Sequence, residues 1–229
     1  MDELVLEEIY KSIKNLTPEY AEFIENTYVQ YLTYSQLPLV FRINSLDMQT
    51  IPTHTKQLFT NSYNILNSKK SIIVQLDTYK PAGFITAVML RKYFKQCILD
   101  DEHINTILYV DTNLLMLDYK KLIDRYNKED DVKYKLTHSL DLLYRDIFEA
   151  DYVFWDKWTM INSEYDVSKL YEILSIRYRN GLGNAFYINT SEQNLTKFMS
   201  VELRDVMDIE GTDAKYSLQN DRYNYTKGS

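Results

Sequence analysis

The stretch Ala150-Asp-Tyr-Val-Phe-Trp-Asp-Lys-Trp158 decides the fold, because it joins a short apolar run to a carboxylate, Asp156. A continuous apolar run of this length is typical of a strand buried on both faces of a parallel sheet. In such sheets ligands bind beyond the carboxyl ends of the strands, where Asp156 would lie. The next residue is Lys157, which neither holds a metal ion nor accepts a proton while it is charged. We therefore expect a strand end built for a ligand, with its chemistry altered.

Further strands and helices alternate along the rest of the chain. Apolar runs of the same form predict strands at residues 71–76, 107–110 and 185–188. Helical patterns predict helices at residues 54–68, 85–96, 114–126, 140–149 and 167–179. Strands that alternate with helices predict a parallel α/β sheet covered by helices on both faces. Right-handed crossovers then bring the carboxyl ends of the strands, and any ligand, to one edge of the sheet.

Residues 1–36, here called the N-terminal arm, read as two amphipathic helices. Thr17-Pro18-Glu19 is a start signal for the second helix, with proline at the first helical position and a carboxylate near the positive helix end. The arm holds seven acidic and two basic residues, a net charge of −5. Its apolar stripes supply the partner contacts that we predict, at Leu6, Ile9, Ile13, Tyr20, Phe23, Ile24 and Tyr28.

Two interpretations of this arm remain open from the sequence. As a partner-binding extension, it could be deleted with loss of binding while the rest of the chain stays folded. As a helix pair packed on the protein's own core, it would present only a solvated acidic face, as amphipathic surface helices usually do.

Composition excludes several classes of protein. At 229 residues, with 45% hydrophobic and 26% charged residues, the chain suits one main soluble domain. A net charge of −7 argues against a nucleic-acid-coating protein, although a weak single-stranded DNA contact stays open. The single Cys97 excludes an internal disulfide, and three scattered histidines give no metal-ligand spacing. No signal pattern or membrane span is recognised, so a cytoplasmic location is expected.

The residues after the first strand form a poor phosphate loop. In a P-loop fold this strand leads into Gly-x-x-x-x-Gly-Lys-Ser/Thr, whose amides, lysine and hydroxyl hold phosphate and magnesium. The chain has Asp77-Thr-Tyr-Lys-Pro-Ala-Gly-Phe-Ile-Thr86. If Gly83 is the second glycine, Phe84 replaces the lysine and Ile85 replaces the hydroxyl residue. Thr78 and Lys80 complete the candidate nucleotide site, and Lys80 is the one residue that could rebuild a phosphate contact. We expect no ATP or magnesium as a regular cofactor.

From Leu37 to about Tyr216 the order of segments resembles the DnaC/DnaI-type replicative helicase loaders, a branch of the AAA+ ATPases. The segments that carry the resemblance are Leu37–Leu46, Ile107–Leu115, Ala150–Asp156, Leu170–Gly181 and Ala185–Ser191. The resemblance implies an AAA+ domain over residues 37–220, followed by a disordered tail over 221–229. Composition suggests a phage or mobile element of a low-GC bacterium as its source.

The resemblance also assigns roles to single residues. It places Asp156 in the Walker B strand, Lys157 where the family has a second acid, and Asn189 at the sensor position. It puts Arg177 near a subunit interface of the family, so Arg177 is a candidate partner contact together with Trp158. The family's interface arginine is not found, since its place falls near Met199.

These departures lead to the functional expectation. We expect a pseudo-ATPase in DNA replication that binds the replicative helicase or another AAA+ replication protein as loader or adaptor, with a homo-oligomer left open. One alternative is an inhibitor that mimics a loader subunit and blocks host replication. Another is an active ATPase with a rebuilt phosphate site.

Overall fold

Parallel strands form a single sheet of five, in the order β2-β3-β4-β1-β5. The protein is described by a computed structural model, which covers residues 3–40, 55–76, 82–126, 144–157, 164–189 and 215–217. The strands are β1 (Ile72–Leu76), β2 (Ile107–Asp111), β3 (Tyr152–Asp156), β4 (Gly183–Asn189) and β5 (Lys215–Ser217). The four predicted strands are confirmed. The sequence reading missed β5, whose three residues form no apolar run.

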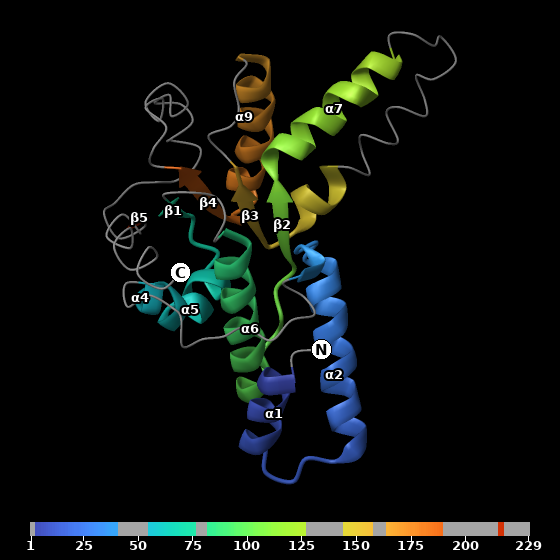
Figure 1. The fold of residues 1–229 in the computed structure, drawn as a ribbon, viewed down its shortest axis with the longest axis vertical. Helices are drawn as coiled ribbons and strands as arrows, with labels where there is room; N and C mark the ends of the chain where they lie inside the picture. The colour runs from blue at the N-terminus through green and yellow to red at the C-terminus, as the bar shows by residue number, and fades with distance from the viewer. Residues whose placement is uncertain are drawn as a thin grey trace.

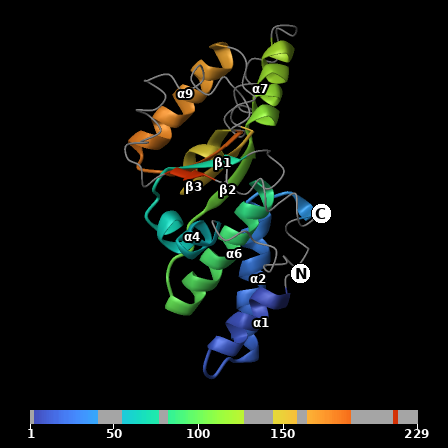
Figure 2. The same cartoon turned by 60° about the vertical axis from the view of Figure 1, so that its left-hand side comes forward.

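Helices cover both faces of this sheet, as the alternating pattern predicted (Figure 1). One face carries α6 (Ala82–Asp100), with α1 (Glu3–Ser12), α2 (Pro18–Tyr34), α4 (Thr55–Thr60) and α5 (Ser62–Asn67) packed around it. The other face carries α7 (Thr112–Tyr126), α9 (Glu164–Arg179) and helical residues 144–149. Figure 2 shows the same two layers on either side of the strands. The fold is therefore a mixed α/β fold with a P-loop-like core.

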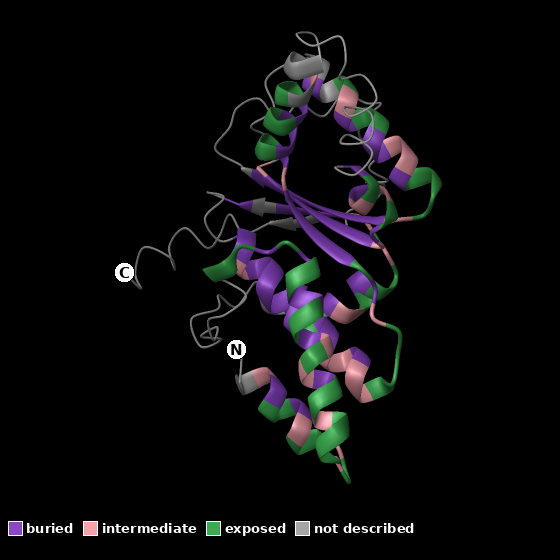
Figure 3. Ribbon diagram, turned by 90° about the vertical axis from the view of Figure 1, so that its right-hand side faces the viewer, coloured by how far each residue is buried: buried purple, intermediate pink, exposed green. Residues whose placement is uncertain are grey.

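Alternate residues of each strand face the two helical layers. In β3, Tyr152 and Phe154 belong to the core cluster under α6, whereas Val153 and Trp155 belong to the cluster under α7 and α9. All four side chains are fully buried, as Figure 3 shows for the strands generally. Burial on both faces is why β3 is apolar throughout instead of alternating with polar residues.

The helix predicted at 54–68 is divided into α4 and α5. The hydroxyl of Ser62 donates to the carbonyl oxygens of Leu58 and Phe59, at 3.1 and 2.9 Å. Serine hydroxyls that bond nearby backbone carbonyls compete with regular helix hydrogen bonds. The apolar periodicity of the stretch did not show this local break.

The N-terminal arm packs on the rest of the protein. Thr17 caps α2 by accepting a hydrogen bond from the backbone N–H of Tyr20 at 3.2 Å, as its start signal predicted. On the inner side of α2, Tyr28 packs against Phe94 of α6 with ring centroids 4.9 Å apart. The buried side chains of the arm belong to one core cluster with α6, so this side of the arm packs on the protein's own core. Deleting residues 1–36 would remove apolar cover from α6, so whether the rest of the chain folds without the arm stays a prediction to be tested.

The carboxyl end of α2 also covers an exposed edge of the sheet. Strand β2 is an edge strand, and its Tyr109 N–H donates to the carbonyl oxygen of Ser35 at 2.7 Å. A paired edge offers less backbone for association with another strand. Among the described residues, no helix is both long and apolar enough to cross a membrane.

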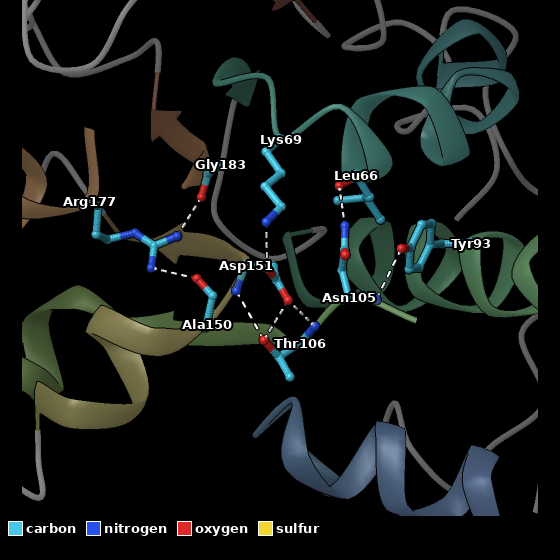
Figure 4. Close-up of polar contacts among 9 residues, drawn as sticks. All are labelled: Leu66, Lys69, Tyr93, Asn105, Thr106, Ala150, Asp151, Arg177 and Gly183. Carbon is cyan, nitrogen blue, oxygen red and sulfur yellow. Dashed lines mark hydrogen bonds and ion pairs between the residues drawn. The ribbon is translucent and has the colours of Figure 1, made fainter. Parts of the chain in front are cut away.

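A polar network closes the amino end of the sheet (Figure 4). Asp151 accepts hydrogen bonds from the backbone N–H and the hydroxyl of Thr106, both at 2.9 Å. The ammonium of Lys69 forms an ion pair with the same carboxylate at 2.6 Å. Burial opposes ionisation of Asp151, but these contacts outweigh it and lower the pKa of the carboxyl. The charged form of Asp151 thus ties the β1, β2 and β3 ends together.

Candidate functional site at the carboxyl edge of the sheet

Two carboxylates lie directly opposite each other where β2 and β3 end. The register pairs Asp111 with Asp156, so both side chains project from the same face of the sheet. Tyr109 lies two residues before Asp111 and projects from that face as well, toward α6. Unscreened like charges on neighbouring strands repel each other. The neighbours of these two carboxylates therefore decide what the site can do.

Asp156 is 5% exposed, and both of its oxygens are occupied by protein donors. The phenol hydroxyl of Tyr109 donates to Oδ2, and the backbone N–H of Lys157 donates to Oδ1 at 2.8 Å. Burial raises the pKa of Asp156, and the two hydrogen bonds act in the opposite direction. Burial and the adjacent Asp156 charge also raise the pKa of Tyr109, which keeps the phenol protonated and able to donate.

Lys157 turns back toward the same edge. Its backbone has φ of 54°, in the left-handed region that non-glycine residues rarely adopt. Its ammonium forms an ion pair with Oδ2 of Asp111. This hydrogen bond, together with the nearby charge of Asp156, raises the pKa of Lys157. The edge therefore has a fixed positive charge beside its two carboxylates.

A pair of hydrogen-bonded hydroxyls lies at the start of α6. Tyr187 of β4 and Thr86 are joined by a hydrogen bond of 2.7 Å between their hydroxyls, and Thr86 also donates to the carbonyl of Ala82 at 3.0 Å. Both side chains are fully buried. Burial raises the pKa of Tyr187, so its phenol stays neutral. These bonds tie the first turn of α6 to the centre of the sheet.

The residues aligned with the phosphate loop serve the core instead. Gly83 is buried in the first turn of α6, and Ile85 is 2% exposed within the cluster under this helix. Phe84 is partly buried and packs against the same cluster. Thr78 and Lys80 lie outside the described residues. Asn189 ends β4 beside Leu76 in the register, at the edge where the sensor role implied by the resemblance would place it.

Most of the predicted partner contacts in the arm are buried. Leu6, Ile9, Ile24 and Tyr28 are at most 5% exposed, and Ile13 packs partly buried against the same cluster. This corrects their assignment, since a side chain that holds the arm on α6 cannot also contact a partner.

The two remaining arm residues lie on the surface of α2. Tyr20 is 38% exposed and Phe23 is 57% exposed. Their rings stack with centroids 6.1 Å apart, next to exposed Glu19 and Glu22. The exposed part of the predicted contact set is therefore a small aromatic patch in an acidic surround.

Arg177 is buried, which corrects its assignment as a partner contact. Its guanidinium donates to the side chain of Asn184 at 2.8 Å and to three backbone carbonyls, of Ile147, Ala150 and Gly183. Figure 4 shows two of these carbonyl contacts. Burial lowers the pKa of Arg177 to about 9. These hydrogen bonds connect α9 to the starts of β3 and β4. Trp158, the other predicted contact from this region, lies outside the described residues.

Sequence reasoning missed Tyr109, Asp111, Thr86 and Tyr187 as parts of the site. A usable signal was present in β2, where Tyr109 and Asp111 share one face at a period of two. Reading the polar ends of all strands together would have placed Asp111 beside Asp156.

The protein is a parallel α/β protein with a P-loop-like core. Its strand-end carboxylates, Asp111 and Asp156, accept hydrogen bonds from groups of the protein itself. No family model matches the chain, and no curated protein matches it. Among solved structures, a candidate primosome component from Streptococcus pyogenes serotype M3 is similar, with a TM-score of 0.51 and 13% sequence identity. The match covers 80% of this chain and 90% of that chain. At this identity the likeness shows a shared fold.

Proposed function

We propose that the protein acts in DNA replication as a non-hydrolysing, helicase-loader-like adaptor of the AAA+ type, which binds the replicative helicase or another AAA+ replication protein. The observation that carries the proposal is the occupation of Asp156 by Tyr109 and Lys157. A carboxylate in this position of an ATPase must remain open to magnesium and water.

Two observations support a role in replication. A similar solved structure is named as a candidate primosome component, and its match extends over most of both chains. The order of motifs resembles helicase loaders independently of that comparison. Fold likeness alone leaves function open, because one fold hosts many functions.

The chemistry of the carboxyl edge disfavours ATP hydrolysis. Lys157 supplies a cation where a second acid would polarise the attacking water. Asp156 already accepts hydrogen bonds at both oxygens. Phe84 and Ile85 fill apolar space instead of offering an ammonium and a hydroxyl.

The partner surface that remains is the patch formed by Tyr20 and Phe23 on α2. Exposed aromatic side chains are favoured anchors of protein interfaces. Because Glu19 and Glu22 flank the patch, a complementary partner would offer an apolar pocket bordered by lysine or arginine.

ATP turnover tests the first part of the proposal. The purified protein and its Asp156→Ala variant should both release phosphate at the background rate, with and without magnesium. Robust turnover that is lost in the variant would overturn the proposal and favour an ATPase with a rebuilt site. A Lys80→Ala variant would then show whether Lys80 supplies the phosphate contact.

Affinity capture from the lysate of a low-GC bacterium tests the second part. Tagged protein should recover the replicative helicase, and Tyr20→Ala/Phe23→Ala should recover at least tenfold less. Tyr178→Ala is the matched control, because Tyr178 is 49% exposed on α9, far from the arm in the sequence. Recovery of a host loader or initiator without helicase would replace the adaptor role with the inhibitory one.

A further inference from the structure

The register of β2 and β3 brings two carboxylates together at the carboxyl edge of the sheet. Asp111 and Asp156 are direct neighbours on β2 and β3 and carry like charges close together. The Asp111 charge is among the causes that raise the pKa of Asp156, after burial of the carboxyl. A nucleotide-binding protein would meet such acidic groups with a divalent cation.

In this protein, hydrogen-bond donors of the chain itself contact both carboxylates. Asp156 accepts from the Tyr109 phenol and the Lys157 amide, as described above. Asp111 accepts from the backbone N–H of Leu114 at 3.1 Å through Oδ1, and it pairs with the Lys157 ammonium through Oδ2. All four carboxylate oxygens therefore have a protein donor. Of these donors, only Lys157 brings a positive charge.

The backbone at Lys157 adds an independent observation. A left-handed conformation is unfavourable for a non-glycine residue, and such strain persists where surrounding contacts hold it. At Lys157 the strained turn is the feature that returns the side chain to the strand end just completed. The amide of the same residue donates to Asp156 while its ammonium binds Asp111. One residue thus joins both carboxylates.

We propose that Lys157 is an internal cation that takes the place of a bound divalent metal ion at this edge. This makes the edge complete without nucleotide or magnesium, and it rests on the proposed non-hydrolysing function. Lys157 therefore does more than replace an acidic group. Its ammonium stabilises the sheet edge, where an ATPase site without its metal ion would leave Asp111 and Asp156 repelling each other.

Removing the ammonium tests the proposal directly. The urea midpoint of the native protein should be the same in EDTA and in millimolar manganese(II) chloride. Lys157→Met should lower the midpoint in EDTA and regain at least half of the loss in manganese, because an ion that binds only the folded state stabilises it. Bound manganese should be detectable in the variant, and not in the native protein, by electron paramagnetic resonance.

Two further variants keep the test decisive. Lys120→Met is the matched control, since Lys120 pairs with Asp166 at 2.7 Å between α7 and α9. It should lose stability without regaining it in manganese. If Lys157→Met does not fold, Lys157→Gly removes the charge while suiting the left-handed backbone, and it should show the same manganese response.

The proposal is overturned if neither Lys157 variant responds to manganese, or if the native protein responds as strongly as they do. No step of this experiment uses ATP. Turnover in the native protein would therefore overturn the proposed function separately, whereas a failed manganese response would leave that function standing and remove the internal cation.

Discussion

The phenol of Tyr109 donates a hydrogen bond to Oδ2 of Asp156, across the boundary between β2 and β3. The backbone N–H of Tyr109 meanwhile donates to Ser35 at the end of α2. One residue of the edge strand thus contacts both the N-terminal arm and the strand-end carboxylate. Because Asp156 is almost fully buried, the phenol supplies part of the solvation that water would otherwise provide.

Replacing this phenol should destabilise the fold. Tyr109→Phe removes the hydroxyl and leaves a buried carboxylate oxygen without its donor, at a cost of about 1 to 3 kcal/mol. Urea unfolding at neutral pH measures the loss. Tyr178→Phe, at an exposed position, should have no measurable effect. Equal stability of the two variants would mean that Asp156 does not depend on the phenol.

Asp156 and Asp151, at opposite ends of β3, should respond to pH in opposite ways. The pKa of folded Asp156 lies above its ordinary value of 3.8, so its contribution favours folding at low pH and is lost as pH rises through the folded pKa. The pKa of folded Asp151 lies below 3.8, so its contribution is present at neutral pH and is lost as pH falls through that lowered pKa.

Amide substitutions separate these contributions. Relative to the native protein, Asp156→Asn should gain stability as pH rises above about 4, and Asp151→Asn should lose stability as pH rises toward about 4 from the acid side. Urea midpoints at several pH values give both differences. Parallel pH profiles for the two variants would contradict the opposite signs assigned to the two pKa shifts.

Arg177 should prove essential to folding. Arg177→Met leaves three buried carbonyls without the guanidinium donor, and each buried acceptor left unpaired typically costs about 1 to 3 kcal/mol. Thermal unfolding or soluble yield provides the measurement. Arg179→Met, on the exposed side of the same helix, should lie within about 0.5 kcal/mol of the native protein. A stable Arg177→Met variant would show that the fold does not depend on the hydrogen bonds of the Arg177 guanidinium.

Two neighbouring residues of α2 should have different roles: Ile24 should contribute to stability and Phe23 to partner binding. Ile24 is fully buried, so Ile24→Ala should cost about 2 to 5 kcal/mol in the free energy of unfolding. Phe23 is 57% exposed, so Phe23→Ala should leave stability within about 0.5 kcal/mol and lower partner capture. Chemical denaturation and the capture assay, run on both variants, check this division. The reverse pattern would place the partner surface elsewhere.

The parallel α/β class follows from the sequence alone, because continuous apolar runs of strand length alternate with helical periods and leave few other arrangements. It also determined that the phosphate loop and the residue after Asp156 depart from an ATPase pattern, since these are statements about residue types at fixed spacings. The start of α2 followed from local chemistry as well, through Thr17 and Pro18.

Which residues contact each other depends on tertiary packing, which the residue pattern does not show. Asp111 and Asp156 are far apart in the chain and become neighbours through the β2–β3 register, and Lys157 reaches Asp111 through one left-handed turn. The arm's apolar stripes fitted either a partner or the protein's own core. Packing on α6 settled that choice for the buried side chains, because a periodic stripe shows that a helix buries a face and not what covers it.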